Sequence, residues 1–365
     1  MSNMPPGAVP YVRDPRAPRK KPYVTWFERE GLELVSGYAV DDLGALALGY
    51  WERLGCAASY VHLEGGNGYV GALVAEIPPG GQTKPIHHMF EAQVLILRGS
   101  GVSQFWVTDD KSKALTLEWR RGSVFSPPLN VWYQLFNGSG SEPVRFAAVS
   151  NAPMIANIYR NSDFIFNTPY HFADRFDGRD NYFSSEFEKS EEEDTSVNFI
   201  PDVYAVPLTS HEERGRGYSR LGISLSGNAM AGHIGSFAVG TYKKIHRHGG
   251  GAQVIVLGGT GYSVMWPAEG DPERDLVRAD WHAGSLVVPP ENWYHSHFNT
   301  GPEPARVLAL RRGFRGLGPD WYSTISSREG GHQLEYEDEP ANIRPMYEAE
   351  LAKRGVTLQM APIQR

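Results

Sequence analysis

The chain of 365 residues contains two long segments that repeat each other. The segment AQVLILRGSGVSQFW begins at Ala92, and AQVIVLGGTGYSVMW begins at Ala252, an offset of 160 residues (252 minus 92). Farther along, WRRGSVFSPPLNVWYQLFN begins at Trp119 and WHAGSLVVPPENWYHSHFN begins at Trp281, an offset of 162 (281 minus 119). A period this long is incompatible with a solenoid and instead predicts two homologous domains.

Each repeat consists of short apolar, β-branched segments separated by Gly, Pro and Asn, which predicts antiparallel strands and turns. The sequences GSG and GGTG stand between two strand-like runs, and no helix follows them, so a phosphate-binding loop is excluded. We interpret both as hairpin turns. The content of 40 Gly, 26 Pro and 12% aromatic residues agrees with a turn-rich, all-β protein.

Composition also excludes several classes of protein. A net charge of −7 gives no nucleic-acid-binding surface, and no stretch approaches the ~20 apolar residues of a membrane span. The single cysteine, Cys56, cannot form an internal disulfide, and the N-terminal segment has no apolar run typical of a secretory signal. We expect a soluble, cytoplasmic protein without nucleic-acid or membrane partners, whose basic cluster from Arg16 to Lys21 is a solvated arm.

The repeat divides the chain into five regions. We expect an N-terminal arm and helical region at 1–58, a first barrel at 59–150, a linker at 151–214, a second barrel at 215–314 and a C-terminal extension at 315–365. The N-terminal region includes the helix-like stretch DDLGALALGYWERLG, and the linker has an aromatic first part that should pack on the barrels and an acidic, solvated middle, SSEFEKSEEEDTS. In the extension, Ile343–Arg354 predicts one surface helix with Pro345 near its start.

Four histidines of the second copy form two closely spaced pairs. His246 and His248 are two residues apart, as are His295 and His297. Residues two apart on a strand point to the same face, and a small barrel brings distant strands together around one lumen. Three neutral imidazoles that converge there bind a first-row divalent metal well. We therefore predict a metal site, since ordinary polar histidines would not need this pairing.

These segments resemble the two sequence motifs of the cupin superfamily. The segment from Tyr242 is similar to the first motif, HxH followed after four residues by an acid or amide and then a glycine. The segment from Gly284 is similar to the second, which reads here Gly284, Pro290, Asn292, His295 and Asn299. The resemblance covers both copies and implies a bicupin: two tandem cupin (double-stranded β-helix, jelly-roll-like) barrels with short flanking helices. It also implies that His246, His248 and His295 are metal ligands.

The fourth cupin ligand is usually glutamate, and this chain has Gln253 instead. Gln253 can be a weak ligand, a hydrogen-bond donor to a ligand, or a structural residue. The first copy has Gln93 at the same place, where no metal is expected, so we favour a structural or hydrogen-bonding role.

The first copy has lost its site. Ile86 aligns with His246, His88 with His248 and Tyr133 with His295, so one ligand remains. A site improvised from His87, His88 and Glu91 is disfavoured, because adjacent residues of a strand point to opposite faces. We expect the first barrel to be a scaffold without metal.

Three histidines without a carboxylate resemble the ferrous sites of cupin dioxygenases of the gentisate type, which are also bicupins. Those enzymes usually hold the metal in the first barrel, and oxalate decarboxylase-type bicupins add a glutamate to the three histidines. We expect one divalent metal per chain, Fe(II) first and Mn, Ni or Zn as alternatives. The expected function is a ferrous dioxygenase that cleaves a small chelating substrate, aromatic or not, in a homo-oligomer.

Other residues near the motifs have weaker assignments. His297 can relay a proton near neutral pH or make a structural hydrogen bond. Trp293 and Trp266 can stack on a substrate, although Trp106, the twin of Trp266 in the first copy, favours a core role for Trp266. Alternative functions are a non-redox lyase, hydrolase or isomerase that uses Zn, Ni or Mn, and a non-catalytic small-molecule sensor or accessory protein.

Overall fold

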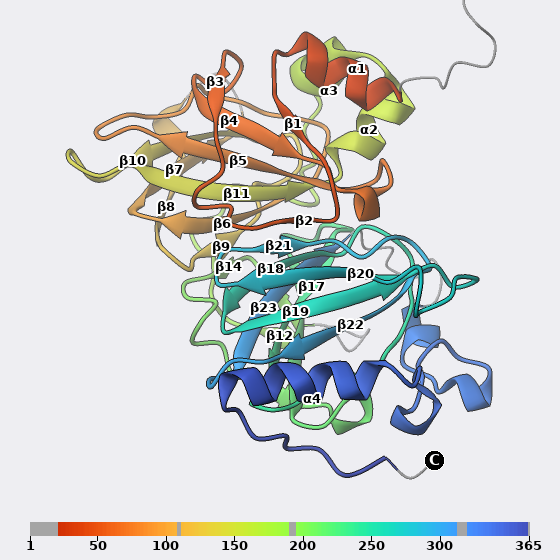
Figure 1. Cartoon of the computed structure of the whole chain (residues 1–365). Coiled ribbons are helices and arrows are strands. Elements are labelled where there is room, and N and C mark those ends of the chain that lie inside the picture. Colours follow the sequence, from red (N-terminus) through yellow and green to blue (C-terminus); the bar gives the residue numbers. More distant parts are fainter. Residues whose placement is uncertain (1–20, 108–110, 190–194, 312–319, 364–365) are drawn as a thin grey trace, which may run out of the picture.

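The chain forms two β-barrels stacked one on the other (Figure 1). The computed structural model describes residues 21–107, 111–189, 195–311 and 320–363. In each barrel a large sheet faces a three-stranded sheet across the barrel lumen. The prediction of an all-β chain with two tandem barrels and short flanking helices is confirmed.

Barrel 1 has its large sheet in the order β1-β4-β5-β11-β6-β9-β14, with β3 paired to β4, and its small sheet in the order β10-β7-β8. The strands are β1 (Leu34–Val35), β3 (Gly49–Trp51), β4 (Cys56–Val61), β5 (Gly71–Ile77), β6 (Ala92–Arg98), β7 (Ser100–Trp106), β8 (Leu115–Arg120), β9 (Val124–Phe125), β10 (Trp132–Asn137), β11 (Val144–Ser150) and β14 (Phe199–Ile200).

Barrel 2 repeats this plan. Its large sheet has the order β12-β13-β16-β17-β23-β18-β21-β2, with β15 paired to β16, and its small sheet has the order β20-β19-β22. The strands are β2 (Ala39–Val40), β12 (Glu188–Lys189), β13 (Thr195–Val197), β15 (Thr209–Ser210), β16 (Tyr218–Leu225), β17 (Ala231–Phe237), β18 (Gln253–Gly258), β19 (Thr260–Trp266), β20 (Val277–His282), β21 (Leu286–Val287), β22 (Tyr294–Asn299) and β23 (Ala305–Arg311).

The two barrels exchange short strands. β2 precedes barrel 1 in the sequence but pairs with β21 of barrel 2, where Ala39 lies opposite Val287. β14 belongs to the segment between the barrels but pairs with β9 of barrel 1, where Phe199 lies opposite Phe125. The N-terminal region and the linker therefore complete sheets of both barrels.

The large sheets of the two barrels pack face to face. One cluster of buried apolar residues contains Leu95 and Ala147 of barrel 1 together with Ile255 and Leu308 of barrel 2. The other face of each large sheet lines the lumen of its own barrel. Strands that are buried on both faces have unbroken apolar sequences, which explains the runs AQVLIL and RVLAL.

Glu91 fixes the contact between the barrels through hydrogen bonds to the backbone. Its carboxylate accepts the N–H groups of Ala229 at 2.9 Å and Met230 at 2.8 Å, at the start of β17. Arg175 forms an ion pair with the same carboxylate at 3.0 Å. A buried carboxylate needs such partners, so this contact holds the two barrels in one arrangement.

The prediction that GSG and GGTG form hairpins is wrong. β6 and β7 belong to different sheets, as do β18 and β19, so each turn is a corner from the large sheet to the small one. Gly99 and Gly259 have φ angles of +86° and +85°, which favour glycine. A barrel closes through such corners, whereas a hairpin would leave both strands in one sheet.

The flanking segments carry the helices α1 (Pro22–Arg29), α2 (Ala152–Tyr159), α3 (Ser162–Asn167) and α4 (Ile343–Arg354), and the short 3₁₀ helices Glu64–Gly66, Lys111–Lys113, Glu212–Arg214, Asp320–Ser323, Ser327–Glu329 and Tyr336–Asp338. α4 confirms the predicted C-terminal helix. The stretch DDLGALALGYWERLG contains no helix, because it forms β3 against β4 instead. The aromatic part of the linker packs on barrel 1, where Ile165 and Phe166 are buried in the core.

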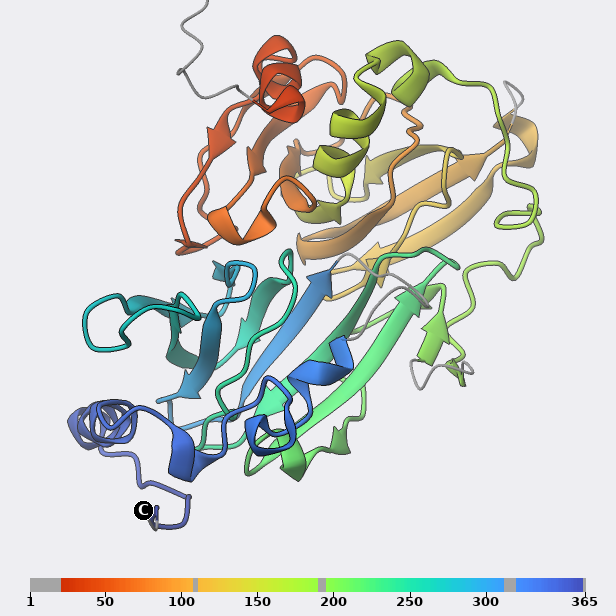
Figure 2. The same cartoon turned by 90° about the vertical axis from the view of Figure 1, so that its right-hand side faces the viewer.

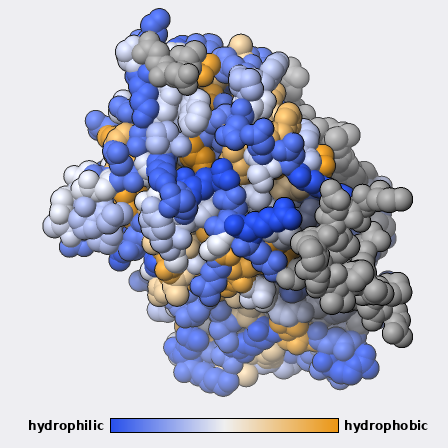
Figure 3. Space-filling view, turned by 90° about the horizontal axis from the view of Figure 1, so that it is seen from above, coloured by the Kyte–Doolittle hydropathy of each residue, from blue (hydrophilic) through white to orange (hydrophobic). Residues whose placement is uncertain are grey.

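Figure 2 shows α1, α2 and α3 together beside barrel 1, and α4 at the opposite end of the molecule beside barrel 2. The face seen from the side of α1 and α3 is mainly hydrophilic, and its apolar residues form separate small areas (Figure 3). Residues 190–194 of the acidic middle of the linker, and residues 1–20 with most of the basic cluster, lie outside the described residues. Among the described helices, none has the length and apolar character required to cross a membrane.

Candidate metal centre

The two histidine pairs meet in barrel 2. The segment around His246 lies beside β22, where the N–H of His246 donates to O of His295 at 3.1 Å and the N–H of His295 donates to O of His246 at 2.9 Å. The ring centroids of His246 and His295 are 4.4 Å apart, and those of His248 and His295 are 4.7 Å apart. The potential ligand atoms of these three residues all lie within 4.8 Å of one another.

Backbone carbonyl groups fix the orientation of the three rings. Nδ1 of His246 lies 2.9 Å from O of Lys244, Nδ1 of His248 lies 2.7 Å from O of Gly249, and Nδ1 of His295 lies 2.9 Å from O of Trp293. A carbonyl oxygen only accepts hydrogen bonds, so each Nδ1 carries the proton. Each neutral ring therefore has its lone pair on Nε2, which is the donor set that a divalent metal requires.

Burial keeps these imidazoles neutral. It lowers the pKa of His295 to about 3, and it lowers the pKa values of His246 and His248 well below the usual value. Repulsion from Lys243 and from the other rings adds to the effect for His246. Neutral imidazoles do not have to lose a proton before they bind a metal, so the residues present fit a divalent ion.

Gln253 does not face this site. On β18, Val254 pairs with Ala309 and both line the cavity, whereas Gln253 pairs with Leu310, which belongs to the core between the barrels. Gln253 is fully buried on that side. The expectation that it is a ligand or a hydrogen-bond donor to a ligand is thus wrong, and the structural alternative agrees with its position.

The residue before Gln253 explains why the expected role of Gln253 at the metal is wrong. Ala252 lines the cavity, so the inward position at this end of β18 carries a methyl group and no ligand atom. A shift of one residue along a strand reverses the face on which a side chain lies. Gln93 of barrel 1 has the same orientation as Gln253 and donates from Nε2 to O of Met230 at 3.1 Å, across the barrel interface.

A cavity of about 30 Å³ adjoins the three histidines, and its walls include the apolar side chains of Val254, Val307 and Ala309. Among the described residues that line it, none is acidic. It is large enough for a water molecule or a few ligand atoms. Metal coordination would therefore take place in an enclosed and largely water-free space.

Lys243 is a polar residue of this cavity that the sequence interpretation missed. Its Nζ lies 3.3 Å from Nε2 of His246. Because Lys243 is three residues before His246, strict alternation would place them on opposite faces. Tyr242 lies opposite Phe298 and His246 opposite His295, so four steps on one segment face three on the other. This extra residue is a bulge, and it turns Lys243 inward beside His246.

His297 lies at one side of the same cavity, as predicted, and its ring centroid is 5.9 Å from that of His295. Its Nδ1 is 2.7 Å from Oγ of Ser263, and Oγ also accepts the Nε1–H of Trp281 at 3.1 Å. The hydroxyl proton of Ser263 can then be donated to Nδ1, so that the proton of the neutral His297 ring is on Nε2. Barrel 1 keeps the Trp119–Ser103 pair but has Leu135 in place of His297.

Neither tryptophan lines the cavity. Trp266 pairs with Tyr294 on the outer face of the small sheet and belongs to the cluster beneath α4. Trp293 packs against the barrel 2 core, with its ring centroid 5.8 Å from that of Tyr38. The substrate-stacking roles expected for Trp266 and Trp293 are therefore not supported by their positions. Arg247 faces outward, as expected, with its guanidinium 5.4 Å from the Tyr294 ring centroid.

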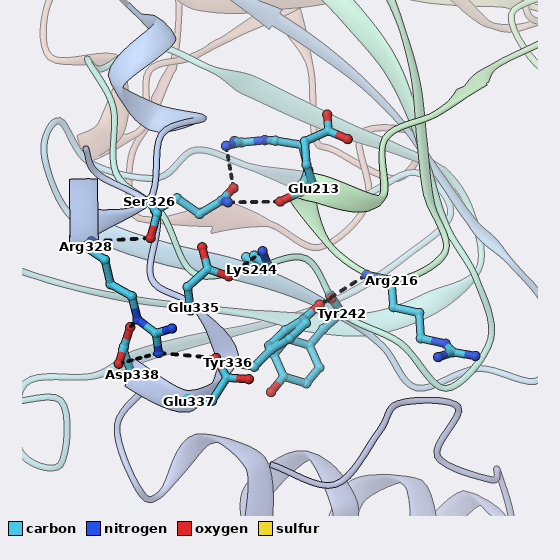
Figure 4. A network of polar contacts seen from close by, with 12 residues as sticks. Glu213, Arg216, Tyr242, Lys244, Ser326, Arg328, Glu335, Tyr336, Glu337 and Asp338 are labelled. Carbon is cyan, nitrogen blue, oxygen red and sulfur yellow. Dashed lines mark hydrogen bonds and ion pairs between the residues drawn. The ribbon is translucent and has the colours of Figure 1, made fainter. Parts of the chain in front are cut away.

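The C-terminal extension supports the segment that carries the first two histidines. The N–H of Leu334 donates to O of Ile245 at 2.8 Å, and the N–H of Arg247 donates to O of His332 at 3.1 Å. Arg214 donates to Oε1 of Gln333 at 2.7 Å. Figure 4 shows the neighbouring contacts of this extension, including the ion pair of Lys244 with Glu335. A local sequence pattern does not signal this support, since the partners are far apart in the chain.

Barrel 1 has the same geometry without the ligands. Ile86 lies opposite Tyr133, as His246 lies opposite His295. Nε2 of His88 is 3.0 Å from the hydroxyl of Tyr133, and its Nδ1 is 2.7 Å from O of Phe90. His87 instead contacts Asn130, and Glu91 contacts backbone N–H groups, so the improvised site does not form. In the described part of the chain, the three histidines of barrel 2 are the one group suited to a metal.

Comparisons with known proteins place the fold. No family model matches the chain, and no curated protein matches its sequence. A structure of oxalate decarboxylase from Bacillus subtilis at pH 4.6 has a TM-score of 0.50 and 12% identity, and the match covers 76% of this chain and 77% of that one. The R92A mutant of the same enzyme has a TM-score of 0.50 and 12% identity over 91% of this chain and 90% of that one. A 7S globulin from Momordica charantia has a TM-score of 0.49 and 14% identity, over 76% of this chain and 85% of that one.

Identities this low carry information about the fold alone. The matches of TM-score 0.50 extend over both barrels, and the order of sheets is the same in the two halves of this chain. The chain therefore has a bicupin fold, with its histidine triad in the second barrel.

Proposed function

We propose that barrel 2 is a metal-dependent catalytic centre that binds one divalent ion through His246, His248 and His295. Fe(II) is the first candidate, with Mn, Ni or Zn as alternatives, and the proposed reaction is the oxidative cleavage of a small chelating molecule, as in gentisate-type dioxygenases. The observation that carries the proposal is the convergence of three histidine side chains whose Nδ1 atoms are held by backbone carbonyl groups.

The chain's own residues define what can happen at this centre. Three protein ligands leave coordination positions for a substrate, because Ala252 offers no fourth ligand. A bound divalent ion would act as a Lewis acid and, if it is iron, as a redox centre. The apolar walls exclude bulk water, and Lys243 and His297 place N–H groups next to the substrate space.

A second candidate is a non-redox reaction such as a decarboxylation. The fold is similar to that of oxalate decarboxylase, and Lys243 and His297 offer two groups that can hold or move a proton beside the triad. The absence of a carboxylate from the described lining separates this site from a three-histidine, one-glutamate centre. Oxygen uptake distinguishes the two candidates.

Metal content tests the site directly. We expect one divalent ion per chain in protein purified anaerobically without a histidine tag, with its identity given by elemental analysis. His246→Ala and His295→Ala should lose this metal, since each removes one of three ligands. His88→Ala is the matched control, because His88 is the equivalent residue of barrel 1 and should leave the content unchanged. Retention of one metal per chain by both barrel 2 variants would contradict the assignment.

Oxygen consumption tests the reaction. Protein loaded with Fe(II) should consume oxygen when a suitable chelating acid or phenol is added, and His295→Ala should not. Release of carbon dioxide without oxygen uptake would support the decarboxylase candidate. Binding of such acids or phenols without any conversion would support a non-catalytic binding protein.

The predicted homo-oligomer is checked by sedimentation.

A further inference from the structure

The turn between β4 and β5 of barrel 1 rests on the rim of barrel 2. Within this turn, residues 64–68, Gly65 is buried. The carbonyl O of Gly65 accepts the N–H of Gly251 at 2.8 Å. Nδ2 of Asn67 donates to Oε2 of Glu291 at 2.6 Å. One turn of barrel 1 therefore contacts two segments of barrel 2 that are far apart in the sequence.

A side chain at Gly65 does not fit against barrel 2. A Cβ atom at this position would lie 2.3 Å from O of Val288 and 2.5 Å from O of Pro289. Both oxygens belong to the backbone, so they cannot move aside as the end of a flexible side chain can. Glycine is the residue that lets two backbones approach this closely. The contact between the turn and barrel 2 therefore depends on the missing side chain of Gly65.

The two contacted segments lead directly to the triad. The first, residues 249–251, follows His248, and O of Gly249 lies 2.7 Å from Nδ1 of that ring. The second begins with Pro289, which lines the cavity beside the triad. It continues to Asn292, whose N–H donates to O of His248 at 2.9 Å. A shift of either segment would move a group that fixes a ligand ring or a wall of the cavity.

The counterpart turn of barrel 2 makes a different contact. The turn between β16 and β17 rests on barrel 1, where Oγ of Ser226 donates to O of Ser126 at 3.1 Å and Nδ2 of Asn228 donates to Oγ of Ser126 at 2.6 Å. A Cβ atom at Gly227 of this turn would meet no atom within 4 Å. Ser126 and Val288 are equivalent in the two repeats. The tight contact through glycine therefore lies on the rim of the barrel that has the triad, and side-chain contacts lie on the other rim.

We propose that the turn at residues 64–68 completes the metal centre of barrel 2, with Gly65 as a positioning residue for the ring of His248. The close contact keeps the two rim segments together, and these segments fix the ring and the cavity wall. Barrel 1 then has a function at the site although it lacks the triad itself. This inference rests on the proposed function, and it makes metal binding in one barrel depend on the other barrel.

The first test observes the His248 ring by NMR in metal-free, full-length protein with isotope-labelled histidines. Gly65→Ala should shift the resonances of Nδ1 and its proton, because the carbonyl group of Gly249 that holds them moves. A His248→Gln variant identifies these resonances. Glu91→Gln is the matched control, because it weakens the reciprocal contact, in which the turn of barrel 2 rests on barrel 1. It should leave the His248 resonances unchanged.

The second test titrates the same proteins with Co(II), whose visible absorption depends on the arrangement of its ligands. Gly65→Ala should change the spectrum and weaken binding about ten-fold or more, as expected when a group that orients a metal ligand is disturbed. Glu91→Gln should keep the spectrum and the affinity of the parent, although it lowers stability. A folded Gly65→Ala protein with the His248 resonances and Co(II) spectrum of the parent would overturn the inference. Equal changes in Glu91→Gln would overturn it as well.

Asn67→Gly decides the matter if Gly65→Ala does not fold. Asn67 has a φ of +44°, which glycine adopts without strain, so this variant removes the side-chain contact with Glu291 and keeps the turn. It should shift the His248 resonances and weaken Co(II) binding. No change in either measurement would then refute the inference.

The metal-free spectra separate this inference from the proposed function. A parent that binds no metal, but whose His248 resonances respond to Gly65→Ala and not to Glu91→Gln, keeps Gly65 as the positioning residue and refutes the metal centre. A parent that binds one metal per chain, with no response to Gly65→Ala or Asn67→Gly, keeps the metal centre and refutes the role of the turn.

Discussion

We expect that the replacement of two residues creates a metal site in barrel 1. Ile86 and Tyr133 lie opposite each other as His246 and His295 do, and His88 already has its Nδ1 fixed by a backbone carbonyl at 2.7 Å. Ile86→His together with Tyr133→His should therefore create three converging imidazoles. The double variant is best made with His295→Ala, which removes one ligand from barrel 2, so that any metal bound belongs to barrel 1.

The size of the effect follows from the contacts that change. Loss of the buried Ile86 side chain costs about 2 kcal/mol. Loss of the 3.0 Å contact between Tyr133 and His88, with imidazole groups left unpaired, costs ~1–3 kcal/mol more. A metal that binds only the folded state, at a concentration 1,000 times its Kd, raises the free energy of unfolding by about 4 kcal/mol. The metal should therefore offset the destabilisation almost completely.

Thermal unfolding with and without Zn(II) measures this stabilisation by the metal. The exchanged strands and the shared core predict that both barrels unfold together. For a chain of 365 residues, 4 kcal/mol then corresponds to a rise in Tm of about 5 °C. Each single replacement in the same background supplies only two imidazoles and serves as the control. A folded double variant with neither a Tm shift nor a bound metal would refute the equivalence of the two barrels.

Three more changes test the structure. Ala252→Glu should place a carboxylate in the cavity beside the triad, and elemental analysis should then show a shift of the metal content toward Mn. Gln253→Glu should leave the metal content unchanged and lower the free energy of unfolding in urea by about 2–4 kcal/mol, because its charge is buried between the barrels. The opposite pattern would mean that Gln253 faces the metal. Burial lowers the pKa of His88 from 6.5 to about 3, so the unfolded chain takes up the proton first and the stability of the folded protein falls as the pH drops below 6.5. At pH 5 this one histidine should cost about 2 kcal/mol of stability. A His88→Gln variant that loses as much stability as the parent between pH 7 and pH 5 would contradict this. Glu91→Gln removes the ion pair with Arg175 and weakens the hydrogen bonds to two backbone N–H groups, so we expect the free energy of unfolding in urea to fall by about 1–3 kcal/mol. An unchanged unfolding midpoint would mean that this contact does not hold the barrels together.

The sequence by itself determined the two barrels and singled out the histidines that we propose as metal ligands. The repeat fixes the number of domains, because homologous segments form the same strands and turns. The spacing of His246 and His248, and the absence of histidine at Ile86 and Tyr133, are local features that can be read without any knowledge of strand pairing. The predicted helix Ile343–Arg354 was also correct, since the signals that begin and end a helix lie within a few residues of it.

Only the tertiary structure decided which side chains share the cavity with the triad. The face on which Gln253 and Ala252 lie depends on the register of β18 against β23, and a shift of one residue reverses it. A bulge turns Lys243 inward, and the lengths of two paired segments define that bulge. Val254 and Ala309 are far apart in the sequence, and the pairing of β18 with β23 brings both to one cavity. Long-range pairing of this kind has no signal in a single local segment, which is why the lining of the cavity appeared only in the folded chain.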